Sequence, residues 1–334
     1  MEMVALGLYP SFQCLAKNCP STCCAGWGIL VDEKDYRRFL QLEPLWLRKD
    51  VLSNIREKDG KYFFINREGG RCAMLDKDGL CRIQRNTTEK ALCNTCRKYP
   101  RLVRKSEGVL YLSMAASCPV VAEYLFRSTV FWMKSCKKEI GRPSSTSIWE
   151  KAEIGEIPVL ENVWAVYQKS RDRAEEIFGQ DRKIDLLYGC FEKMADGVLD
   201  IVLQHREGNR LLSFFQVLGQ DASDKVGQFI RDTHPEWKVF KENYMVYRLL
   251  SRKIEFPDEQ AISCYRQASG EIFLLRTIAF CAYAKGQRLT KERWAGLLCI
   301  VYRFCAHGKR VSKAFGGLLS SFFPEDCFWD YMLF

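Results

Sequence analysis

Hydrophobic positions follow a helical period through most of this 334-residue chain. From Pro119 onward, apolar side chains recur every three or four residues, the spacing that places them on one face of an α-helix. The segment after Pro119 is predicted to be a helix with four residues on one face: Val121, Leu125, Trp132 and Cys136. Further amphipathic helices are predicted at about 158–178, 181–206, 208–219, 236–252, 258–284 and 290–306.

Residues 1–118 show shorter patterns. Asp32 is a suitable N-cap for a helix that runs to Leu42, and Pro44 suits the first turn of a second short helix. Aromatic and β-branched runs predict strands at 61–66 and 109–113. Glycine-containing pairs predict turns at Gly69-Gly70, Asp78-Gly79 and Glu107-Gly108.

These patterns predict a mainly α protein with two parts. We expect an irregular, cysteine-rich, metal- or cluster-binding region with short strands at 1–140, and an all-helical domain at 148–334. The segment Gly141–Ser147 is the expected linker between them. A loop-rich region with so little regular structure requires an additional constraint, and a bound metal supplies one.

Nine of the chain's sixteen cysteines lie between Cys14 and Cys118. Short spacings of this kind bring several thiolates to one point at a low cost in loop-closure entropy, as a metal or cluster site requires. Cysteines needed only for packing have no reason to be grouped. The groups, in order, are Cys14-x4-Cys19-x3-Cys23-Cys24, Cys72-x8-Cys81, Cys93-x2-Cys96 and Cys118-Pro119.

The compartment decides what these cysteines can do. The first twelve residues show no export signal, and the longest apolar stretch, Ile272–Ala284, is too short to span a membrane and is broken by Arg276. We therefore expect a cytoplasmic protein with no membrane contact. In a reducing cytosol, clustered cysteines are more often metal ligands than disulfides, and a disulfide framework stays the alternative.

The spacing favours an iron–sulfur centre, most simply 4Fe-4S, and leaves zinc as the alternative. A structural zinc site usually has two separated C-x2-4-C pairs, whereas only Cys93 and Cys96 form one here. The thiols also outnumber the ligands of a single four-coordinate site. Cys23 and Cys24 are adjacent and point in different directions, so one could ligate while the other packs.

Positive charge is concentrated with the cysteines. Residues 1–150 contain 25 Lys and Arg against 16 Asp and Glu, whereas residues 151–334 contain 26 against 25. This charge could hold an anionic part of a cofactor, for which Arg97 and Arg101 are the candidate carboxylate contacts. Nucleic acid is not expected as a partner, because no nucleic-acid-binding module accompanies the basic residues.

Other catalytic signatures are absent from the sequence. It has no P-loop, no G-x-G-x-x-G and no G-x-S-x-G. The three histidines, His205, His234 and His307, all lie late in the chain and are interpreted as core or surface residues. No catalytic residue is identified from these patterns.

An ordered set of motifs resembles the flagellin lysine-N-methylase family, within a wider group of cysteine-rich zinc- or iron-chelating proteins. The set covers about residues 9–125. Beyond the cysteines of the first two groups, it comprises Trp27, Leu75, Arg82-Ile83-Gln84, Ala91-Leu92, Cys96-x2-Tyr99-Pro100-Arg101 and Ser117-Cys118-Pro119.

The resemblance implies a protein that methylates surface lysines of flagellin with S-adenosylmethionine and contains an iron–sulfur centre. Cys93 is an addition to the family pattern and is ranked as a weaker ligand. A non-catalytic, metal-binding accessory protein is the alternative, since no cofactor-binding signature is present. The ligands implied by the resemblance are Cys14, Cys19, Cys23, Cys24, Cys72, Cys81, Cys96 and Cys118.

Overall fold

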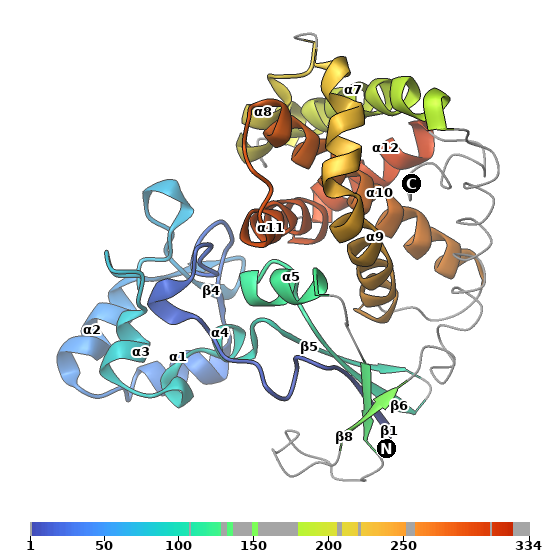
Figure 1. Ribbon diagram of the computed structural model, residues 1–334. Coiled ribbons are helices and arrows are strands. Elements are labelled where there is room, and N and C mark those ends of the chain that lie inside the picture. The colour runs from blue at the N-terminus through green and yellow to red at the C-terminus, as the bar shows by residue number, and fades with distance from the viewer. Residues whose placement is uncertain are drawn as a thin grey trace.

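The structure, a computed structural model, describes residues 2–106, 108–127, 132–135, 149–152, 180–205, 209–219, 222–251, 258–307 and 309–322. Short helices and strands make up the N-terminal part, and long helices make up the C-terminal part (Figure 1). The mainly helical character and the N-terminal short strands that the sequence predicts are both confirmed. None of the helices in the described residues combines the length and the apolar character needed to cross a membrane.

The N-terminal part contains four short helices and a small antiparallel sheet with the strand order β2-β4-β3. Both predicted helices are confirmed, because the side chain of Asp32 accepts a hydrogen bond from the Asp35 N–H at 2.8 Å and Pro44 directly precedes the second helix. The elements are α1 (Glu33–Phe39), α2 (Leu45–Ser53), α3 (Arg82–Asn86), α4 (Asn94–Lys98), β2 (Leu30–Val31), β3 (Ile55–Lys58) and β4 (Lys61–Phe64).

A second sheet of five strands has the order β5-β6-β1-β7-β8. Its central strand β1 (Glu2–Leu6) pairs in parallel with β6 and antiparallel with β7. The other strands are β5 (Arg101–Ser106), β6 (Val109–Met114), β7 (Trp132–Ser135) and β8 (Trp149–Ala152).

Two sequence predictions are wrong at this sheet. Trp132 lies in strand β7 and not on the face of a helix, and Trp149–Ala152 forms a strand within the region 148–334 that was expected to be all-helical. The helix after Pro119, α5 (Pro119–Leu125), ends before Trp132. The cause is non-local, because β1 leaves an open edge that β7 pairs with and β8 then extends. Cys136 lies outside the described residues.

Within the described residues, the C-terminal part contains the α-helices α7 to α12, and five of these six match predicted positions. Helix α9 begins earlier than expected, α12 was not predicted, and the helix expected at 158–178 lies outside the described residues, as does the boundary at 140–148. The bounds are α7 (Gln180–His205), α8 (Asn209–Phe215), α9 (Val226–Ser251), α10 (Asp258–Ala284), α11 (Lys291–His307) and α12 (Lys309–Phe322).

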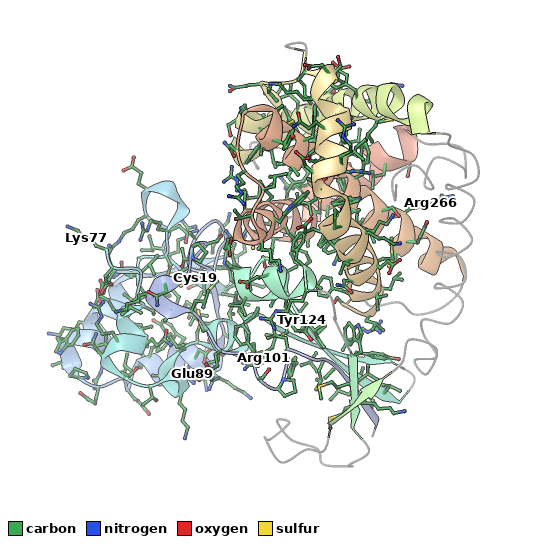
Figure 2. All side chains as sticks on the ribbon, viewed as in Figure 1. Cys19, Lys77, Glu89, Arg101, Tyr124 and Arg266 are labelled. Carbon is green, nitrogen blue, oxygen red and sulfur yellow. The ribbon has the colours of Figure 1, made fainter. Side chains whose placement is uncertain are left out.

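Two hydrophobic cores organise the described residues. The larger core joins β1, β6 and α5 to the C-terminal helices. The smaller core involves residues between 29 and 93 and contains Phe39, Phe64 and Ile83. Figure 2 places Cys19 between the part built on the smaller core and the helices of the larger one. The seam between the two cores therefore runs through the cysteine-rich segments.

Candidate functional site

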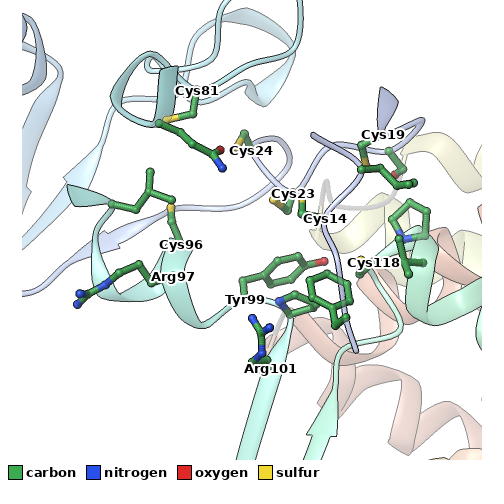
Figure 3. Close-up of a pocket in the computed structure, with 18 of the residues that line it drawn as sticks. Cys14, Cys19, Cys23, Cys24, Cys81, Cys96, Arg97, Tyr99, Arg101 and Cys118 are labelled. Atoms are coloured by element: carbon green, nitrogen blue, oxygen red, sulfur yellow. The ribbon is translucent and has the colours of Figure 1, made fainter. Parts of the chain in front are cut away.

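Seven of the predicted cysteine ligands surround one cavity of about 210 Å³ at this seam (Figure 3). Trp27, Tyr99, Arg97 and Arg101 also line the cavity. The structure thus brings together residues that are up to a hundred positions apart in the chain. The seven cysteines are Cys14, Cys19, Cys23, Cys24, Cys81, Cys96 and Cys118.

Cys24 and Cys72 are held side by side by backbone pairing. The Cys72 N–H donates to the Cys24 carbonyl at 2.7 Å, and the Gly26 N–H donates to the Gly70 carbonyl at 3.0 Å. Gly26 and Gly70 both have positive φ, a conformation that glycine adopts without steric cost. Cys72 itself is buried and packs in the smaller core.

Three other cysteines immediately precede short helices. Cys81 precedes α3, Cys93 precedes α4 and Cys118 precedes α5. In each case backbone N–H groups from the first turn donate to the sulfur, which lowers the pKa of the thiol against the effect of burial. The same local geometry therefore presents each sulfur with donors that favour the thiolate form, which is the form that binds a metal.

The position of Cys93 is set by residues of α1. The carboxylate of Asp35 accepts a hydrogen bond from the Asn94 N–H at 2.5 Å, and the Arg38 guanidinium donates to the Leu92 carbonyl at 2.7 Å. Arg38 and Asp35 also form an ion pair at 2.6 Å. These contacts fix the turn that brings the Cys93 thiol into a hydrogen bond with the Cys96 thiol.

One group of thiols lies against the smaller core. Burial raises the pKa of Cys72 to about 12, and nearby Cys24, Cys81 and Cys93 raise it further. Burial likewise raises the pKa of Cys81, with added contributions from Cys24 and Cys93. The hydrogen bond with the Cys93 thiol is the main cause that raises the pKa of Cys96. These five thiols therefore share one electrostatic neighbourhood.

A second group lies toward the helices. Burial raises the pKa of Cys118 to about 11, and the neighbouring thiols Cys19 and Cys14 contribute. The pKa of Cys23 is raised first by its hydrogen bond with Cys24, then by burial, and also by Cys14 and Cys118. That same hydrogen bond lowers the pKa of Cys24 to about 7. Cys23 therefore lies with the second group, whereas Cys24 contributes to the raised pKa of Cys72, Cys81 and Cys96 and also to that of Cys19.

Helix α11, in the C-terminal part, contacts the segments that carry the second group of thiols. One nitrogen of Arg303, Nη2, donates to the carbonyls of Ser21, Thr22 and Ser117 at 3.1, 3.3 and 3.2 Å. His307 forms a hydrogen bond to the Ser117 hydroxyl at 2.8 Å, and Ser117 is also bonded to the Tyr99 hydroxyl at 3.0 Å. These contacts fasten the 19–24 loop and the segment before Cys118 to one helix.

The two arginines predicted to contact a cofactor carboxylate both reach the cavity wall. The Arg97 guanidinium lies 4.0 Å from Asp35, and its Nε is buried with no hydrogen-bond partner among the described residues. The Arg101 guanidinium lies over the Phe12 ring at 5.2 Å from its centroid. In Figure 3 the Arg97 guanidinium extends away from the labelled thiols. The buried Nε of Arg97 would suit an anionic ligand, whereas Arg101 already packs on an aromatic ring.

Four polar side chains of the cysteine-rich part that could accept a proton, those of Asp76, Asp78, Tyr99 and Tyr111, lie in different surroundings. Asp76 and Asp78 pair with Arg85 on the surface of the cysteine-rich part. Tyr111 is buried in β6 under the guanidinium of Arg104. Tyr99 alone of these candidates lines the cavity.

The spacing of the thiols bears on which metal group they could hold. Across the described part of the chain, no three His, Cys, Asp or Glu side chains are grouped closely enough to hold one. A tetrahedral zinc site has Zn–S bonds of about 2.3 Å, which brings its sulfur atoms to roughly 4 Å from one another. An iron–sulfur cluster carries its own iron and sulfide, so its thiolate ligands stand further apart. Thiols are soft donors of the kind that bind either zinc or an iron–sulfur cluster.

Comparison with known proteins gives a distant relationship. The chain is 28% identical over 138 residues to the flagellar biosynthetic protein FliU of Salmonella muenchen, covering 40% of this chain and 82% of that protein. It is 29% identical over 115 residues to a lysine-N-methylase of Salmonella typhimurium and, equally, to one of Salmonella choleraesuis. These matches cover 33% of this chain and only 29% of each methylase. No family model matches the chain, and no solved structure matches it.

Several residues of the site carry no signal that sequence reasoning could use. Arg303 and His307 reach the cysteines from helix α11, far away in the chain. The indole N–H of Trp27 donates to the Cys23 carbonyl at 2.6 Å, which gives a structural reason for a tryptophan at that position. The C-x2-C spacing of Cys93 and Cys96 was visible in the sequence, and the structure places their thiols in a hydrogen bond.

Proposed function

We propose that this protein is a protein-lysine N-methyltransferase that acts on flagellin with S-adenosylmethionine and holds a cysteine-ligated iron–sulfur centre. The observation that carries the proposal is the similarity to proteins named lysine-N-methylase, supported by the similarity to a flagellar biosynthetic protein. The convergence of seven predicted cysteine ligands on one cavity supports the cluster.

Methyl transfer to lysine is a displacement by the neutral amine and requires no radical. The lysine has a pKa near 10.4 in water, so the protein must favour its deprotonated form and align it with the methyl sulfonium. The three-cysteine C-x3-C-x2-C loop of radical enzymes is not reproduced, because the position after Cys23-x2 is Gly26. When bound, an iron–sulfur cluster would hold together the cysteine segments that line the cavity, and so would fix the side chains that meet the methyl donor.

This chain's own residues would then position the reactants. Arg97, whose buried Nε has no hydrogen-bond partner among the described residues, is the better candidate for the carboxylate of the donor. Tyr99, in the cavity wall, is a polar side chain placed to meet the incoming amine, and Gln84 and Glu89 also line the cavity. The hydrogen bonds of Arg303 and His307 keep the 19–24 loop and Ser117 in register while the cavity is occupied.

A metal-binding accessory protein without catalysis is the second candidate. It is favoured by the cavity volume of about 210 Å³, which is below the roughly 300–1,000 Å³ of common small-molecule sites. The matched segment also spans only 29% of the methylases.

Intact-mass measurement of flagellin separates the two candidates. Purified, cluster-replete protein is incubated anaerobically with flagellin and S-adenosylmethionine. Each methyl group adds ~14 Da to flagellin if the protein is the methyltransferase. Unchanged flagellin mass, with the cluster demonstrably present, supports the accessory protein. A heat-denatured sample of the same protein is the control for non-enzymatic methylation.

A further inference from the structure

The nine N-terminal thiols fall into two groups according to where they lie around the cavity. We call the first the inner group, which consists of Cys24, Cys72, Cys81, Cys93 and Cys96, and the second the outer group, which consists of Cys14, Cys19, Cys23 and Cys118. The Cys93 thiol is hydrogen-bonded to the Cys96 thiol within the inner group, and the hydrogen bond of adjacent Cys23 and Cys24 links the two groups. Figure 3 shows Cys24, Cys81 and Cys96 on one side of the cavity, and the outer group on the other side.

Packing divides the thiols in the same way. Every member of the inner group is part of the smaller hydrophobic core or packs directly against it. Cys118 of the outer group belongs to the larger core. The outer group is also the one that Arg303 fastens through the carbonyls of Ser21, Thr22 and Ser117. The positions of the thiols around the cavity and their packing therefore give the same partition.

The number of thiols agrees with two four-ligand sites. One site of four ligands would leave five of the nine cysteines with no role. In the inner group, Cys24, Cys81 and Cys96 line the cavity and Cys93 is hydrogen-bonded to Cys96, which leaves Cys72 as a packed fifth member. Two-cluster ferredoxins likewise use neighbouring cysteines of one segment for different clusters, so the adjacent pair Cys23-Cys24 is compatible with two centres.

We propose that this chain holds two iron–sulfur clusters, one ligated by Cys24, Cys81, Cys93 and Cys96 and the other by Cys14, Cys19, Cys23 and Cys118. The proposal rests on the iron–sulfur part of the proposed function and extends it to a second centre. It also makes Cys93 a full ligand, in place of the weaker role that the family pattern implies.

The test is the iron and acid-labile sulfide content of the full chain after anaerobic reconstitution with iron and sulfide. Two 4Fe-4S clusters give ~8 iron and ~8 sulfide per chain, whereas one gives ~4 of each. Two double variants address one group each: Cys81→Ala with Cys96→Ala for the inner group, and Cys19→Ala with Cys118→Ala for the outer group. Cys281→Ala, at a fully buried cysteine of α10, is the matched control and keeps the full content.

The expected result is half of the wild-type iron in each double variant, with a helical circular-dichroism signal like that of the wild type. A wild-type content of ~4 iron per chain overturns the proposal however the variants fold, because one 4Fe-4S cluster accounts for it. Two zinc ions per wild-type chain, with one lost in each double variant, would keep the two-centre partition and refute the iron–sulfur cofactor of the proposed function. The two failures are therefore distinguishable.

Discussion

Replacing Arg303 by methionine tests whether helix α11 stabilises the outer group of thiols. The side chain is similar in length but loses the donors that hold the carbonyls of Ser21, Thr22 and Ser117. All three contacts come from one nitrogen, which carries two protons, so about two hydrogen bonds are lost at any moment. Their distances of 3.1 to 3.3 Å are at the long end of the usual range.

The stabilisation lost in Arg303→Met can be worked out from the number and length of these hydrogen bonds. A hydrogen bond to a charged group contributes about 1.5–3 kcal/mol, and half-exposed, long bonds are worth less, so we take about 1 kcal/mol for each. A loss of about 2 kcal/mol corresponds to roughly a 30-fold change, since 1.4 kcal/mol is tenfold. We expect the iron bound by the outer group to be released to a chelator about 30-fold faster in Arg303→Met, and the iron bound by the inner group at the wild-type rate.

The assay is anaerobic iron release to an excess of a coloured chelator, followed by absorbance. Arg303→Met should give two phases of equal amplitude, only one of which is accelerated. Arg310→Met, at an exposed arginine of α12, removes the same charge without touching the cysteine segments and is the control. A single accelerated phase for all of the iron would contradict the separation into two groups, and an unchanged rate would contradict the role assigned to Arg303.

Three further predictions follow from other contacts. Removing the metal anaerobically should raise the rate of amide hydrogen exchange across residues 29–96 and leave α9 to α11 protected, because the smaller core is built on short helices and strands. An equal loss of protection in both parts would contradict a metal-dependent fold of the N-terminal part alone. Arg97→Ala should weaken S-adenosylmethionine binding, measured by calorimetry, about tenfold, because a charge-assisted hydrogen bond is worth about 1.5–3 kcal/mol. Arg101→Ala should change the affinity by less than threefold. A larger loss of affinity in Arg101→Ala than in Arg97→Ala would exchange the roles of the two arginines. Glu271→Gln should lower the free energy of unfolding in urea by about 3 kcal/mol, because it breaks a fully buried ion pair with Arg248 (Nε–Oε2 2.5 Å). The double variant Arg248→Met with Glu271→Leu should recover most of this loss. A change below about 1 kcal/mol in the single variant would count against a stabilising role of the ion pair.

Local signals explain what the sequence could predict of the fold. The helices α1 and α2 begin where Asp32 and Pro44 place them, since capping depends on neighbouring residues only. The long C-terminal helices follow the apolar period. Strand β1 was missed because it is a short apolar run whose partners, β6 and β7, lie more than a hundred residues away. The same non-local pairing made Trp132 a strand residue although its spacing from Leu125 suited a helix.

The candidate site shows the same division between local and non-local information. Clustering of cysteines is a local property, and it correctly indicated which segments converge on a cavity. The assignment of each thiol to a group depends on the two cores, which no spacing reveals. Cys23 and Cys24 are the clearest case, because adjacent residues of one loop belong to different groups.

The position of the thiols at the seam explains how a cluster could matter for a reaction that needs no electron transfer. A displacement at a methyl sulfonium depends on alignment of the reactants, and alignment depends on how rigidly the surrounding segments are held. The cavity wall takes Trp27 from the N-terminal loop, Arg97 and Tyr99 from the region of α4, and Pro119 from the start of α5. Without a bound group, these segments are joined mainly by backbone pairing and by the contacts of α11. In the proposed enzyme, removal of the cluster should therefore weaken binding of S-adenosylmethionine in step with the loss of methyl transfer, whereas a purely chemical role of the cluster would abolish transfer and leave donor affinity unchanged.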